Sequence, residues 1–81
     1  MSIRGVSSEI FIGKSEVNLI DSKKKRYKIQ YDDLDKIDYW LSDKENGKLI
    51  FITKNKQKYC FEYRYTVNDT VLKAIDYIKD K

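Results

Sequence analysis

The sequence predicts an α+β domain, mainly β, in which a strongly bent antiparallel sheet or small barrel of six to seven strands is closed by one C-terminal α-helix. Two observations predict it. Apolar residues alternate with polar ones through residues 3–64, the period of half-buried strands. The period then lengthens to that of a helix over residues 67–80. With 81 residues and neither linker nor internal repeat, we expect one domain over residues 1–81.

The composition is that of a globular chain with a core. Hydrophobic residues make up 41% of the sequence, aromatic residues 14% and charged residues 37%. A domain of this size buries about 60–65% of the surface that its unfolded chain exposes. The seven tyrosines suit strands whose side chains have one apolar and one solvated end.

Three strands are predicted in the first part of the chain, at Glu9–Ile12, Glu16–Asp21 and Tyr27–Tyr31. In each of them, apolar residues occupy every second position. Gly13 and Lys14 form the first turn, and the polar run Ser22–Lys25 forms the next loop.

Three more strands are predicted in the second part, at Ile37–Leu41, Leu49–Ile52 and Lys58–Tyr63. The acidic corner Asp32–Asp35 leads into the first of them. The pair Asn46-Gly47 is a strong hairpin signal because both residue types tolerate a positive φ, and Asn55-Lys56 turns the second hairpin. Since Leu49–Ile52 is apolar on both faces, we expect this strand to be central in the sheet or covered on its second side.

The C-terminal helix is predicted by one apolar stripe, formed by Val67, Val71, Ala74, Ile75 and Ile78. Thr66 and Asp69 have the spacing of a capping box, and Asn68 is an alternative N-cap. A single stripe suits a helix that plugs the open end of a curled sheet. The covered sheet face is either that of Leu49 and Phe51 or that of Ile50 and Ile52.

The residues that most enzymes and metal sites need are missing. The chain has no histidine, and its one cysteine allows neither an intramolecular disulfide nor a zinc cluster. We therefore expect no enzymatic activity, no cofactor and no metal ion. Cys60 lies in the middle of a predicted strand and is expected to be buried and inert. The acidic residues Asp32, Asp33, Asp35 and Asp38 lack the ligand spacing of an EF-hand, which favours a solvated turn.

No stretch approaches the roughly 20 apolar residues of a membrane span, and the N-terminus shows no signal-peptide pattern. We expect a cytoplasmic protein. The frequent use of Lys, Ile, Asn, Asp and Tyr, with no Pro, is typical of an AT-rich bacterial or phage genome.

Four stretches together resemble a small bacterial pleckstrin-homology-like (PH-like) domain: the strands in Glu9–Asp21, the strand Arg26–Gln30, the corner Asp33–Ile37 and the last helix. In that family, a strand is commonly followed by a short step whose two apolar residues turn inward, and Leu34 and Ile37 fit this step. A full domain of the family has seven strands. Either Ile3–Val6 supplies the seventh here, or the resemblance extends only to a related small barrel.

The resemblance implies a binding module without catalytic residues. Members of the family bind phosphoinositide headgroups, or peptides and protein surfaces, and the bacterial members mostly look like interaction modules. The resemblance therefore favours a protein partner over a lipid.

Two groups of cations are candidate anion-binding residues: Lys23, Lys24, Lys25 and Arg26, and Lys54, Lys56 and Lys58. In lipid-binding members of the resembled family, basic residues in the loop that corresponds to Lys23–Arg26 bind phosphates. If the two groups lie close together, they form one basic patch that would also suit nucleic acid. The alternative is a pair of solvated turns whose charges discourage aggregation. The thirteen acidic residues offset much of the field, which leaves a net charge of +4.

Trp40 is the other candidate. In the alternation of Ile37, Tyr39 and Leu41, it falls on the opposite face of the strand. If the helix leaves that face uncovered, Trp40 with Ile50 and Ile52 forms a partner-binding surface, because tryptophan is enriched at binding hot spots.

These observations predict a non-catalytic protein-interaction or adaptor module that binds a protein partner or forms a homo-oligomer through an outer sheet face around Trp40. The alternative is a binder of anionic ligands, either a phospholipid headgroup or nucleic acid, through the basic loops 23–26 and 54–58.

Overall fold

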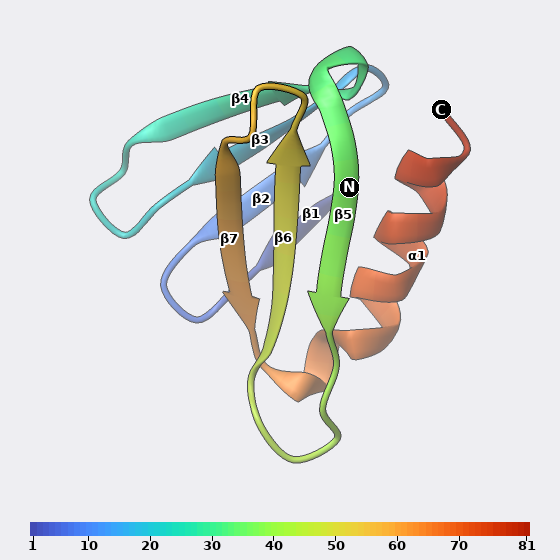
Figure 1. The fold of residues 1–81 in the computed structure, drawn as a ribbon. Coiled ribbons are helices and arrows are strands. Elements are labelled where there is room, and N and C mark those ends of the chain that lie inside the picture. Colours follow the sequence, from blue (N-terminus) through green and yellow to red (C-terminus); the bar gives the residue numbers. More distant parts are fainter.

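The computed structural model describes residues 1–81, and Figure 1 shows its strands followed by one C-terminal helix. The strands are β1 (Ser2–Arg4), β2 (Glu9–Ile12), β3 (Glu16–Ile20), β4 (Arg26–Gln30), β5 (Leu34–Trp40), β6 (Gly47–Thr53) and β7 (Lys58–Tyr63). The helix is α1 (Asn68–Lys79), and 3₁₀ turns at Tyr31–Asp33 and Tyr65–Val67 precede β5 and α1. The predicted mainly β architecture with a C-terminal helix is confirmed.

The strands form two antiparallel sheets, β1-β2-β3-β4 and β5-β6-β7. In Figure 1 the strands of one sheet run across those of the other. No ladder joins the sheets, so the prediction of one bent sheet or closed barrel is wrong. The 3₁₀ turn Tyr31–Asp33 redirects the chain between β4 and β5, which therefore do not pair.

The seventh strand is β1, which overlaps the segment Ile3–Val6 considered for this role. Ile3 is buried and pairs with Ile10 of β2. Immediately after β1, the Val6 N–H donates to the Glu62 carbonyl oxygen of β7 at 3.0 Å. A Cβ at Gly5 would lie 2.6 Å from the Phe61 ring, so this close approach of the two sheets requires glycine.

The core lies between the two sheets and is closed by α1. Fourteen buried hydrophobic residues form one cluster. On β6, Leu49 and Phe51 belong to this cluster, as do Val71 and Ile75 of α1. Because successive side chains of a strand point to opposite faces, the intervening Ile50 points away from the core. The helix thus covers the Leu49 and Phe51 face, and no helix lies over the outer face of β5-β6-β7.

The first hairpin of the second sheet forms for a different reason from the predicted one. Gly47 is the first residue of β6, and its φ is not positive. A Cβ at this position would lie 2.6 Å from the Tyr63 ring and 2.7 Å from the Trp40 carbonyl oxygen. Gly47 is therefore required for close packing rather than for a tight turn. In the second hairpin, Lys56 has a φ of 71°, as a tight turn at Asn55-Lys56 requires.

The start of α1 also differs from the prediction. Val67 is the N-cap residue, and no side chain caps the helix, so both the capping box of Thr66 and Asp69 and the Asn68 N-cap are wrong. The Asn68 amide instead donates to the Ser42 carbonyl oxygen at 2.7 Å. This bond fastens the first turn of α1 to the loop after β5.

Figure 1 places α1 beside β5, with the start of the helix near the lower end of that strand and the chain's C-terminus near the upper end. The helix has twelve residues. No helix in this structure is both long enough and apolar enough to span a bilayer.

Candidate functional site

β5 is the most exposed strand of the second sheet. None of its seven residues is buried, whereas β6 has five buried residues. Tyr39 and Trp40, at its C-terminal end, are 45% and 52% exposed. They point to opposite faces because they are consecutive in a strand. A partner at this edge would meet one aromatic ring on each face.

The outer edge of β5 has no hydrogen-bond partner. β5 pairs only with β6, and apart from the Leu34 N–H, which donates to the Tyr31 carbonyl oxygen in the 3₁₀ turn, none of the remaining backbone bonds involves this strand. The one side-chain bond to this strand comes from the Tyr63 hydroxyl, which donates to the Trp40 carbonyl oxygen at 3.2 Å. The N–H and C=O groups that point away from β6 are therefore free to pair with another strand.

The helix lies beside β5 on the inner face of the sheet, where its buried residues join the core. The Lys79 ammonium lies 6.0 Å from the centre of the Tyr39 ring, and Asn68 is bonded to Ser42. Positions 68, 72 and 79 lie on one flank of a helix, so Leu72, which is 36% exposed, lies on the flank that faces β5.

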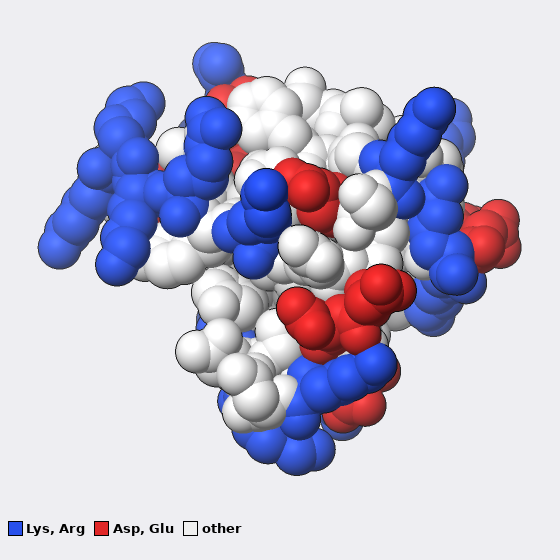
Figure 2. Space-filling view, turned by 90° about the horizontal axis from the view of Figure 1, so that it is seen from above, with Lys and Arg blue, Asp and Glu red and all other residues white.

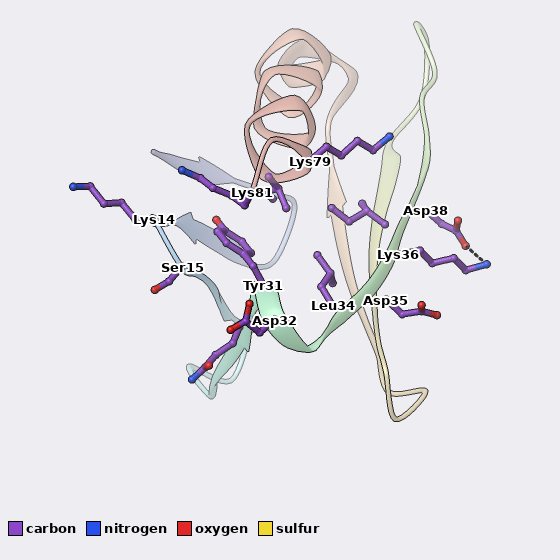
Figure 3. Close-up of a pocket in the computed structure, with 13 residues that line it drawn as sticks. Lys14, Ser15, Tyr31, Asp32, Leu34, Asp35, Lys36, Asp38, Lys79 and Lys81 are labelled. Carbon is purple, nitrogen blue, oxygen red and sulfur yellow. Dashed lines mark ion pairs between the residues drawn. The ribbon is translucent and has the colours of Figure 1, made fainter.

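A cavity of about 760 Å³ opens between the first half of β5 and the last turn of α1 (Figure 3). We call it the β5–α1 cleft. Its apolar residues include Leu34, Ile37 and Ile78. Its rim is charged and consists of Lys14, Asp32, Asp35, Lys36, Asp38, Lys79 and Lys81.

The acidic and basic groups of this rim differ in their pairing. Asp38 forms an ion pair with Lys36 at 3.9 Å, and Asp35 forms one with Lys56 at 3.8 Å. Lys14, Lys79 and Lys81 are in no ion pair, and among the carboxylates only Asp32 is unpaired. The uncompensated charge of the cleft is therefore positive.

Tyr31 forms one wall of the cleft, as Figure 3 shows. Its hydroxyl donates to the Gly13 carbonyl oxygen at 2.6 Å, which fixes the ring. Burial, reinforced by the nearby Tyr77 and Glu16, raises the pKa of Tyr31 to about 12. The phenol therefore stays neutral at physiological pH and does not reduce the positive charge of the rim. Burial likewise raises the pKa of Tyr63, the hydroxyl of which holds the end of β5.

The outer face of the second sheet carries the three predicted partner-binding residues. The strand register places Trp40 opposite Lys48 and places Ile50 between Asp38 and Cys60. Trp40 is thus a diagonal neighbour of Ile50, which is half-buried. Ile52 lies between Lys36 and Lys58 and is only 6% exposed, so it offers little area to a partner.

Cys60 is exposed, and the prediction of a buried thiol is wrong. The inward positions of β7 are taken by Phe61 and Tyr63, both fully buried, which places Cys60 on the outer face. The helix does not reach that face, so nothing covers the thiol.

The first predicted basic group lies in the loop between β3 and β4. Lys23, Lys24, Lys25 and Arg26 are all exposed. One oxygen of Asp21 accepts hydrogen bonds from the backbone N–H groups of Lys23 and Lys25, both at 2.9 Å, and Lys24 has a φ of 68°. A carboxylate therefore organises this loop and offsets part of its charge.

The second basic group lies elsewhere. Lys54, Lys56 and Lys58 are exposed in and after the β6–β7 turn, at the top of Figure 1, whereas the β3–β4 loop is at the left edge. The Lys54 N–H donates to the Asp33 carbonyl oxygen at 2.8 Å, and Lys56 is paired with Asp35. Figure 2 shows a dense cationic group at the left, while elsewhere basic and acidic side chains are interspersed. The two groups thus lie on different loops, and the tilted ring pair of Tyr27 and Tyr59 lies between β4 and β7, the strands that carry these tyrosines.

The side chains of the acidic corner do not converge on one point. No three His, Cys, Asp or Glu side chains are close enough to hold an ion together. Asp35 and Asp38 each have a lysine partner instead.

Sequence reasoning missed the β5–α1 cleft and the places of Tyr31 and Tyr39 beside it. The cleft is lined by residues from the first turn, from β5 and from the end of α1, which no single periodic pattern connects. Comparisons with protein-family models, with curated proteins and with solved structures found no match to this chain.

Proposed function

We propose that this chain is a non-catalytic protein-interaction module that binds an extended segment of a partner protein as an additional strand at the free edge of β5. The observation that carries the proposal is this edge itself. Its outward backbone groups have no partner, and Tyr39 and Trp40 are exposed on its two faces. Strand addition supplies the missing hydrogen bonds, and alternate side chains of the added segment contact the two faces.

The surroundings of β5 support this mode of binding. On one face, a bound segment would contact Trp40, which is a diagonal neighbour of the half-buried Ile50. On the other face, it would contact Tyr39 and the flank of α1 that carries Leu72 and Lys79. The segment would thus be held between the strand and the helix, with apolar contacts on both of its faces.

The resemblance to PH-like domains agrees with this function, since members of that family bind peptides and protein surfaces. We place the protein in the cytoplasm, where a lone, exposed thiol such as Cys60 stays reduced.

The test uses a seven-residue peptide, the length of β5, with the sequence Thr-Glu-Thr-Leu-Thr-Glu-Thr. Its two glutamates and its leucine lie on one face of the extended peptide, and its threonines lie on the other. Trp40 is the only tryptophan, so its fluorescence reports binding at the end of β5. We expect saturable binding of this peptide. Methylation of the amide nitrogens at every second residue should abolish binding for the set that points toward β5. Methylation of the other set, which points away from β5, should leave binding intact. An added strand uses only one of its edges to pair with β5.

Two results would overturn the proposal. One is binding that is equally sensitive to methylation of either set, or no binding at all. The other is concentration-dependent dimerisation of the free protein, measured by sedimentation, that masks Trp40. In that case a second copy of the chain would occupy the edge.

The exposed β3–β4 loop supports a second candidate, an anionic ligand such as a phospholipid headgroup or nucleic acid. Its four cations form the densest positive region in Figure 2. Binding of phosphatidylserine vesicles or single-stranded DNA that weakens steeply as salt rises, in a protein that does not bind the peptide, would favour this candidate.

A further inference from the structure

We infer that the segment bound at β5 carries an apolar side chain between two acidic ones on the face that it turns toward α1. This inference rests on the proposed function and names the chemistry of the partner. It follows from the placement of the unpaired lysines around the apolar floor of the β5–α1 cleft.

The net positive charge of the cleft favours a ligand with negative charge. The carboxylates of Asp35 and Asp38 are each within 4 Å of a lysine ammonium, so they contribute little net field. Lys14, Lys79 and Lys81 have no such partner. Since Asp32 is the one unpaired carboxylate of the cleft, an excess of two positive charges remains. This excess attracts acidic groups and repels basic ones, because the cavity walls reduce solvent screening.

The arrangement of the lysines indicates separate carboxylates rather than one highly charged group. In Figure 3, Lys79 extends from α1 toward β5, whereas Lys14 and Lys81 extend to the other side of the cleft. The Lys79 ammonium lies over the Tyr39 ring, and that of Lys81 lies 4.3 Å from the centre of the Tyr77 ring. Because these cations face different directions, one anionic group cannot contact all three.

The floor of the cleft selects the side chain between the carboxylates. Leu34 lies between Lys79 and the pair Lys14 and Lys81 in Figure 3, and Ile37 and Ile78 line the same cleft. In an extended segment, residues two apart lie on one face, about 7 Å from each other. If one acidic side chain of the segment is placed near Lys79, the side chain two residues later lies near Ile37. The side chain four residues later then lies near Lys81. An apolar residue suits the middle position.

The test compares three peptides that differ only at the two acidic positions, which carry glutamate, glutamine or lysine. Binding is measured by Trp40 fluorescence at low and at high salt. We expect the glutamine peptide to bind about tenfold more weakly than the glutamate peptide, the sum of two partly exposed charge contacts. The lysine peptide should bind more weakly still, and the differences should shrink at high salt.

Lys79→Gln and Lys73→Gln provide matched protein variants. Both remove one positive charge from an exposed position of α1, but Lys73 does not line the cleft. We expect Lys79→Gln to reduce the preference for glutamate over glutamine severalfold, whereas Lys73→Gln leaves it unchanged. Equal binding of all three peptides, or equal effects of the two variants, would overturn this inference and leave strand addition standing. Failure of every peptide to bind would instead remove the proposed function itself.

Discussion

Replacing Phe51 with alanine is expected to lower the free energy of unfolding by about 3–5 kcal/mol. Phe51 is fully buried in the central strand of the second sheet, and the substitution leaves a cavity at the centre of the core. A domain of this size has only about 5–15 kcal/mol of stability in total. Urea denaturation, followed by the fluorescence of Trp40, measures the change.

The matched control is Ile50→Ala, one residue earlier and on the opposite face. Ile50 is only half-buried and lies outside the core cluster, so we expect a loss of about 1 kcal/mol. The contrast tests which face of β6 the helix covers. Similar losses for the two variants would mean that something covers the outer face as well, and the description of an open edge and outer face would then be wrong.

Removal of the two exposed aromatic side chains of β5 is expected to weaken peptide binding most. Tyr39→Ala and Trp40→Ala should each reduce affinity about tenfold or more, the effect typical of aromatic residues at hot spots. Because both side chains are about half exposed, the thermal stability of the free protein should change little. Fluorescence anisotropy of a labelled peptide measures affinity without the tryptophan signal.

Phe11→Ala is the control for these variants. Phe11 is 38% exposed on the outer face of the first sheet, away from β5. The Phe11→Ala substitution should leave the affinity for the peptide unchanged. If all three substitutions weaken binding equally, the peptide adheres to exposed aromatic rings in general, and β5 is not a specific site.

The fold was largely predictable because its core is built from regular alternation. Ile10, Val17 and Ile29 fall at alternate positions of their strands, and all three are buried. The helix stripe of Val71 and Ile75 was equally clear. Such patterns locate strands, faces and helices, because burial of one face imposes a period of 2 or 3.6 on the sequence.

The candidate site was less predictable because it depends on which elements lie side by side. Alternation could not decide whether the helix covers the face of Leu49 or that of Ile50, since both are apolar. The exposure of Cys60 follows from that choice. The β5–α1 cleft forms only because the two sheets separate after β4 and the helix lies along β5. Single residues do not encode this arrangement.

The most direct test of strand addition is amide hydrogen exchange of Leu34–Trp40 with and without the peptide. In the free protein, the β5 amides after Leu34 that point away from β6 should exchange rapidly because they have no acceptor. In the complex we predict strong protection of these amides, with little change in the β3–β4 loop. Unchanged exchange along β5 under conditions in which the peptide is bound would contradict the account.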